Sequence, residues 1–125
     1  MIATVDVIVP LPPRGLSPNY KGAWRTHAKI KKDYRAAVAL CVLGHKPATG
    51  MCEVSLTFGI KNARKLGLWC PRDVDNAIAA FKAGFDGLTD ARVIMNDDRK
   101  HMSLGKVEID STWGPGVRVT ISEDR

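Results

Sequence analysis

The sequence lacks the features that would place the chain in a membrane or in an oxidising compartment. Its longest apolar stretch, residues 36–43, is far too short to span a bilayer. The three cysteines, Cys41, Cys52 and Cys70, are odd in number and form no C-x-x-C pattern, which favours reduced, buried thiols over a disulfide framework. No basic stretch precedes an apolar run near the first residue, so we expect no signal peptide. The sequence therefore predicts a soluble, cytoplasmic protein.

Motifs for nucleotide cofactors and for structural zinc are also missing. The sequence contains neither G-x-G-x-x-G nor G-x-x-x-x-G-K-[ST], which argues against an enzyme that binds a nucleotide cofactor. The spacing of the cysteines and of the three histidines fits no structural zinc site. We therefore expect no small-molecule cofactor.

Charge is plentiful but unevenly distributed. The 125 residues are 45% hydrophobic and 26% charged, which is ordinary for a globular protein, and their number suits one domain spanning residues 1–125. Residues 1–72 contain twelve Lys and Arg against three Asp and Glu, whereas residues 73–125 contain seven against ten. The net charge of +6 thus joins a basic first part to an acidic second part. This pattern fits a polyanion-binding surface beside a cation site, and it also fits an ordinary solvated surface.

Hydrophobic periodicity predicts six elements. Apolar residues alternate in 3–9 and 52–60, which is typical of strands, and two further strands are predicted near 104–110 and 117–122. Apolar residues recur at three- and four-residue steps in 27–43 and 75–88, which is typical of helices. Segments 11–19 and 61–71 are predicted loops. The order β-α-β-α-β-β predicts an α+β (mixed α/β) fold, a four-stranded mixed sheet with two main helices on one face.

Two pairs of acidic residues indicate a metal site. Asp73 and Asp75 alternate just before the second predicted helix, so their carboxylates can converge, and Asp97 and Asp98 follow that helix by a short connection. Two carboxylates about 4 Å apart repel by about 4 kcal/mol at an effective dielectric of about 20, and a hard divalent cation removes this cost. The pairs therefore predict a Mg²⁺ site, in which Mn²⁺ is a possible substitute.

Local roles compete with this interpretation. An aspartate such as Asp75, just before a helical stripe, is also a normal N-cap, and the Asn-Asp-Asp sequence of residues 96–98 is also common in turns. Lys82 follows Asp75 by seven residues, so on one helix the two would share a face within about 20° and the ammonium could stabilise charge on a phosphate. Alternatively, Lys82 pairs with Asp86 on the helix surface.

The basic residues on the loops and at the start of the first helix are candidates for contacts with a nucleic-acid backbone. They are Arg14, Lys21, Arg25, Lys29, Lys61, Arg64, Lys65 and Arg72. Three tryptophans, Trp24, Trp69 and Trp113, are candidates for base stacking or for a subunit interface, although partly buried packing is the more common role of such residues.

These motifs resemble those of the RusA-type Holliday-junction resolvases. The resemblance covers about residues 5–121, and one departure is that Lys82 follows Asn76 by six residues where the best-known pattern has three. The matching segments are RDVDN in 72–76, KAGFDGLT in 82–89, NDD in 96–98, VPLPP in 9–13, SPN in 17–19 and Tyr34-Arg35.

The resemblance implies a RusA-like homodimer that resolves four-way DNA junctions by paired, symmetric nicks in recombination and repair, using Mg²⁺. It implies that Asp73, Asp75 and Asp98 bind the metal and are catalytic together with Lys82, while Asp97 in place of Asp98 remains an open alternative. Two other functions also stay open. The chain can be a nuclease for flaps or forks, or a structure-selective DNA-binding module without turnover.

Overall fold

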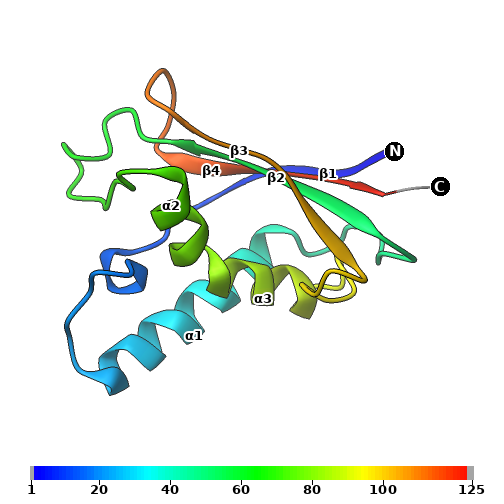
Figure 1. The fold of residues 1–125 in the computed structure, drawn as a ribbon, viewed down its shortest axis with the longest axis horizontal. Helices are drawn as coiled ribbons and strands as arrows, with labels where there is room; N and C mark the ends of the chain where they lie inside the picture. Colours follow the sequence, from blue (N-terminus) through cyan, green and yellow to red (C-terminus); the bar gives the residue numbers. More distant parts are fainter. Residues whose placement is uncertain (1, 124–125) are drawn as a thin grey trace.

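The four strands form one sheet, and the helices are inserted between them along the chain (Figure 1). The computed structural model describes residues 2–123. The elements are β1 (Ile2–Val9), the short 3₁₀ helix η1 (Arg14–Leu16), α1 (Trp24–Cys41), β2 (Cys52–Gly59), α2 (Val74–Ala80), α3 (Lys82–Asp90), β3 (Met102–Asp110) and β4 (Gly116–Glu123). This architecture confirms the predicted α+β class and the four-stranded sheet.

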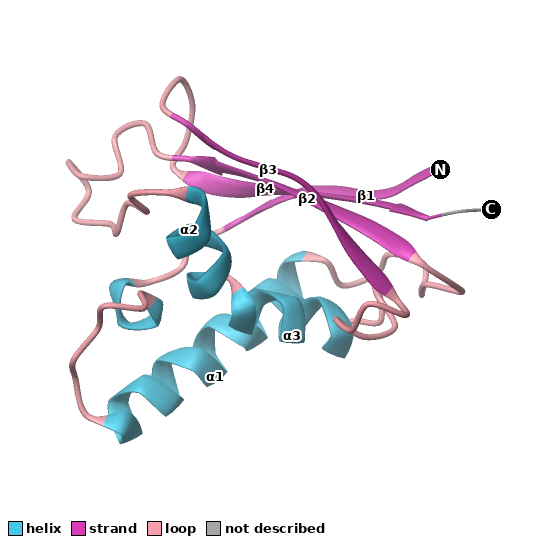
Figure 2. Ribbon diagram, viewed as in Figure 1, coloured by secondary structure: helices cyan, strands magenta, loops and turns pink. Residues whose placement is uncertain are grey.

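The sheet is mixed, with the strand order β1-β4-β2-β3. β4 pairs antiparallel with both β1 and β2, whereas β2 and β3 are parallel. Because parallel strands need a long crossover, the chain between β2 and β3 has room for a loop and for α2 and α3. The helices lie on one face of the sheet, and the other face has no helix over it (Figure 2).

Side-chain alternation explains which face of the sheet is covered. In β2 the side chains of Cys52, Val54, Leu56 and Phe58 are fully buried, and the residues between them are only partly buried. Val117, Val119 and Ile121 of β4 belong to the same core. Alternate residues point to opposite faces of a strand, so this pattern directs one face of the sheet into the core beneath the helices.

The second predicted helix, 75–88, is wrong as a single element. The chain forms two helices that run in different directions and meet at Phe81 (Figure 1). Phe81 has φ −82° and ψ 0°, outside regular helical geometry, and its backbone N–H is shared between the carbonyls of Ala77 and Ile78. Its ring is fully buried and contacts Tyr34, Phe58 and Phe85 edge-on. The break is thus located at the centre of an aromatic cluster, which the 3.6-residue periodicity of the sequence does not encode.

The first helix and the cysteines also depart from expectation. α1 begins three residues earlier and ends two residues earlier than the predicted 27–43.

The prediction of buried thiols holds for Cys52, whereas Cys41 is exposed and Cys70 is partly buried, and all three are free. Cys41 is exposed because α1 buries only Tyr34 and Val38. Within residues 2–123, no helix has both the length and the hydropathy that a membrane span requires.

Candidate active site and nucleic-acid interface

The D-x-D motif lies at the start of α2. Asp73 is the N-cap of this helix, and its Oδ1 accepts a hydrogen bond of 2.8 Å from the backbone N–H of Asn76. The capping role considered for Asp75 therefore belongs to Asp73, because the helix begins one residue earlier than predicted. Asp75 lies in the first turn with its side chain exposed. Its carboxylate is not engaged as a cap, so it is accessible to a ligand.

The second acidic pair lies in a turn immediately before β3. The Asp98 carboxylate accepts hydrogen bonds from the backbone N–H groups of Lys100 and His101, at 3.0 and 3.1 Å, and contacts the His101 ring Nδ1 at 2.7 Å. The His101 side chain holds the pKa of the Asp98 carboxyl below its usual range, and the two backbone N–H groups act in the same direction. Turn chemistry thus accounts for Asp98, whereas no such bonds engage the Asp97 carboxylate within the described chain.

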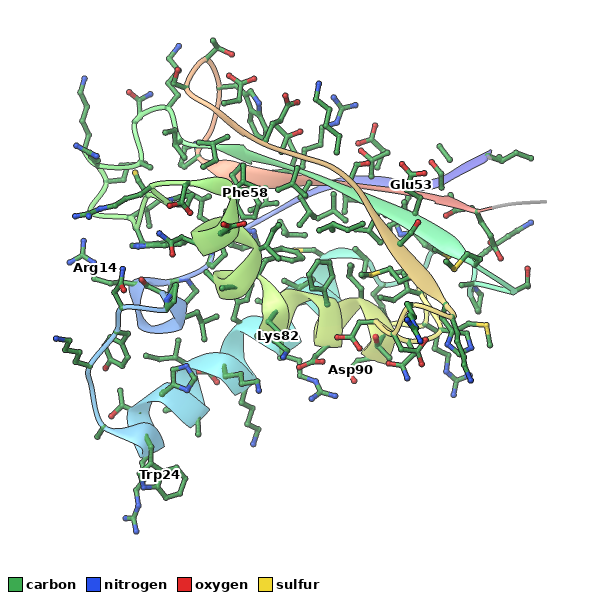
Figure 3. All side chains as sticks on the ribbon, in the orientation of Figure 1. Arg14, Trp24, Glu53, Phe58, Lys82 and Asp90 are labelled. Atoms are coloured by element: carbon green, nitrogen blue, oxygen red, sulfur yellow. The ribbon has the colours of Figure 1, made fainter. Side chains whose placement is uncertain are left out.

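A groove between α2, α3 and β3 brings Lys82 and Asp97 together. We call it the α2–β3 groove, and it is lined by Ile78, Ala79, Lys82, Phe85, Asp97, Met102 and Leu104. Its volume is about 290 Å³. Lys82 is exposed at the start of α3, where the helix axis turns (Figure 3). Its predicted alternative partner, Asp86, forms no ion pair with it in residues 2–123.

Asp75 lies on α2 near this groove, although it is not part of the groove lining. It precedes Ala79 by four residues in a regular helix, so the two share one helix face and lie about 6 Å apart along the axis. Ala79 lines the groove, so Asp75 lies about one helical turn from its edge. Of the second acidic pair, Asp97 rather than Asp98 lines the groove with the lysine. The seven-residue spacing that suggested a role for Lys82 beside Asp75 does not apply across the break at Phe81, and Lys82 instead shares the groove lining with Asp97.

The predicted metal ligands are carboxylates, which suit a hard cation, but the structure does not gather them around one position. Carboxylate oxygens are the ligands that Mg²⁺ prefers. However, within residues 2–123 no three His, Cys, Asp or Glu side chains lie close enough together to hold a metal ion. The carboxylate of Asp73 caps α2 and that of Asp98 is held in its own turn. The assignment of Asp73, Asp75 and Asp98 as metal ligands therefore stays a prediction.

The predicted DNA-contacting cations divide into several groups. Arg14, Lys21 and Arg72 line one pocket, whereas Arg64 and Lys65 line another. We call the first the loop pocket, and it is lined by Arg14, Ser17, Asn19, Tyr20, Lys21, Trp69 and Arg72. Arg14 lies on η1 at one side of the molecule (Figure 3). The structure therefore brings together the 10–23 and 60–73 loops, which are far apart in the sequence.

The other predicted cations are placed differently. Lys29 forms an ion pair of 2.7 Å with Asp33 on α1. Arg25 lies 5.9 Å above the ring of Trp24, which is 75% exposed at the outer end of α1 (Figure 3). Lys61 is exposed at the start of its loop, with no described acidic partner.

Tyr20 lines the loop pocket, a role that the sequence did not indicate. Its ring stacks on His27 with a centroid distance of 6.4 Å and an interplanar angle of 24°. Trp69 packs partly against the hydrophobic core, and Trp113 is partly buried at a different site, beside Gly59. The sequence alone could not place Trp69 and Tyr20 in one pocket, because that requires knowing that the 60–73 and 10–23 loops meet.

Comparison with known protein families and with curated proteins finds no match for the chain. The resemblance to RusA-type resolvases therefore rests on the motifs in the sequence.

Proposed function

We propose that this protein is a Mg²⁺-dependent endodeoxyribonuclease of the RusA type that resolves four-way DNA junctions by paired, symmetric nicks. The observation that carries the proposal is the α2–β3 groove, which is lined by Lys82, by Asp97 and by Ala79, one helical turn after Asp75. The loop pocket adds three cations at the start of the same helix. Acids for a hard cation beside cations for phosphate are a combination that suits metal-dependent phosphodiester hydrolysis.

Each residue has a distinct role in this proposal. Asp73, Asp75 and Asp98 would hold the ion, with Asp97 as the alternative that the groove favours. When bound, Mg²⁺ supplies an activated water and neutralises charge on the phosphate. Lys82 stabilises negative charge on the scissile phosphate through its exposed ammonium. The product would carry a 5′-phosphate and a 3′-hydroxyl, which a ligase can reseal.

The proposal includes a homodimer that binds branched DNA. A four-way junction requires cuts in two strands, and a twofold-symmetric dimer offers two sites in matching geometry. The loop cations position the DNA backbone, and such contacts carry no sequence information.

The decisive experiment incubates a synthetic four-way junction with Mg²⁺ and compares the wild type with Asp75→Asn. We expect symmetric nicks from the wild type and binding without cleavage from the variant, because Asp75 is exposed and its replacement removes a charge without removing a cap. Glu53→Gln is the matched control, since Glu53 alternates with the buried Cys52 and Val54 on β2 and its carboxylate is therefore directed to the face of the sheet opposite the core. Equal cleavage by the wild type and Asp75→Asn contradicts the assignment.

One observation favours a second candidate, a structure-selective DNA-binding module without turnover. It is the lack of a three-acid cluster in residues 2–123. A panel of labelled four-way, fork, flap and single-stranded substrates separates the candidates. Junction binding with no cutting in Mg²⁺ or Mn²⁺ supports the binding module, and preferred cutting of flaps or forks indicates a nuclease of another specificity.

A further inference from the structure

The loop pocket gathers three cations that no acid neutralises in the described chain, and two aromatic side chains, Tyr20 and Trp69, also line it. Its volume is about 340 Å³, within the range of small-ligand sites, and no carboxylate of residues 2–123 lines it. None of its three cations forms an ion pair with an acid in residues 2–123. By contrast, Arg35 and Arg118 each contact an aspartate within 2.7 Å. The pocket is therefore suited to an anion supplied from outside the chain.

The aromatic lining narrows the chemistry of that anion. Trp69 packs partly against the hydrophobic core and also lines the pocket, so the core helps to hold one part of the ring while another is available to a ligand. Tyr20 adds a second ring, held by its stacking on His27. Ser17 and Asn19 supply hydroxyl and amide groups at the same site. A phosphate joined to a flat, hydrogen-bonding ring, which is a nucleotide, matches this set of groups.

We propose that the loop pocket binds one unpaired nucleotide of branched DNA, with its base stacked on Trp69 and its phosphate held by Arg14, Lys21 and Arg72. The inference rests on the proposed nuclease function and adds a part of the substrate to it. A base within a duplex is covered on both faces by its neighbours, so only a nucleotide that has left the stack can lie against an indole.

The position of the pocket agrees with this role. Arg72 directly precedes Asp73, the N-cap of α2, and the α2–β3 groove follows the same helix toward Lys82. The seven residues of α2 span about 10 Å. An unpaired nucleotide held at the start of α2 would therefore direct the neighbouring strand along the helix toward the groove.

The test measures binding in the full chain without divalent ions, so that no cleavage occurs. The probes are a labelled octamer of thymidines and a labelled octamer of abasic residues, which carry the same number of phosphates. We expect the wild type to bind the thymidine octamer about tenfold more tightly by fluorescence anisotropy, because one stacked base changes affinity by roughly 5- to 150-fold. Equal affinity for the two octamers overturns the proposal.

Substitutions test whether Trp69 is the residue responsible for the preference for the thymidine octamer. Trp69→Leu is expected to abolish the base preference and Trp69→Phe to retain part of it, with circular dichroism showing that each variant is folded. Trp24→Leu is the control, since Trp24, the first residue of α1, is exposed and does not line the loop pocket. If Trp24→Leu removes the preference and Trp69→Leu does not, stacking takes place on α1 and the pocket assignment is wrong.

Replacing a cation of the loop pocket is expected to change binding differently from replacing Trp69. Arg14→Gln, at an exposed position, is expected to weaken the binding of both octamers by a similar factor, whereas Lys46→Gln in the loop before β2 leaves both unchanged. Failure of this inference is distinct from failure of the nuclease proposal. Base-dependent binding without junction cleavage in Mg²⁺ refutes the nuclease alone, and cleavage without any base preference refutes the pocket alone.

Discussion

Asp73 combines a structural role with a proposed chemical one, and the two respond differently to substitution. Its carboxylate caps α2 through the backbone N–H of Asn76. Asparagine caps helices about as well as aspartate, whereas replacing a cap with alanine costs about 1 kcal/mol. We therefore expect Asp73→Ala to lower the free energy of unfolding by about this amount and Asp73→Asn to leave it nearly unchanged, as measured by urea denaturation.

Cleavage assays on the same two variants complete this prediction. If Asp73 binds Mg²⁺, both variants lose junction cleavage, although only Asp73→Ala loses stability. Retained cleavage by a stable Asp73→Asn would leave the residue with its capping role alone.

Tyr34 makes stability depend on alkaline pH. Its hydroxyl is buried and donates a hydrogen bond of 2.6 Å to the carbonyl of Pro10. Burial raises the pKa of Tyr34 well above its usual range. Above about pH 10 the unfolded chain releases this proton while the folded chain keeps it, so the unfolded state binds fewer protons and stability falls as pH rises.

The variant Tyr34→Phe isolates this effect. It is expected to lose about 1 kcal/mol at pH 7 through the missing hydrogen bond. Above pH 10 its stability should decline less steeply than that of the wild type, because the titrating group is gone. Unfolding by urea between pH 7 and 11 measures both, and parallel pH curves would show that Tyr34 is not the cause.

At the scale of elements, the contact between α1 and α3 depends on a glycine. A Cβ atom placed on Gly87 would lie 2.5 Å from the backbone carbonyl oxygen of Arg35, and backbone atoms cannot move aside as a flexible side chain can. Gly87→Ala is therefore expected to destabilise the fold by about 1–3 kcal/mol. Thermal unfolding measures the change.

Gly50 provides the matched control for this substitution. Its nearest neighbour for an added Cβ is 4.0 Å away, which is ordinary van der Waals contact. Gly50→Ala should change stability by less than about 1 kcal/mol, in either direction. Similar losses in the two variants would mean that the approach of α1 to α3 is not what makes Gly87 necessary.

At the scale of the whole molecule, the distribution of cations predicts how DNA binding responds to salt. If about six of the loop and helix cations contact phosphates, log affinity should fall with log salt concentration at a slope near −5. Binding of a four-way junction by Asp75→Asn between 50 and 200 mM salt, roughly the range in which such slopes are measured, tests this without cleavage. A slope near −1 would remove the basic surface from the proposed interface.

Local pattern alone determined much of this protein. Alternation in residues 52–60 and 117–122 set the buried face of each strand, because side-chain direction in a strand depends only on position along it. The order of elements then led to the mixed sheet with helices on one face. The D-x-D motif was likewise located correctly at a helix start.

Tertiary structure decided the rest. At the break, Phe81 packs against Tyr34, Phe58 and Phe85, and the first two come from distant parts of the chain. That Lys82 and Asp97 line one groove, and that the 10–23 and 60–73 loops line one pocket, depends on how the helices and loops pack on the sheet. Periodicity describes neighbours along the chain, so contacts between distant segments became visible only once the core had brought those segments together.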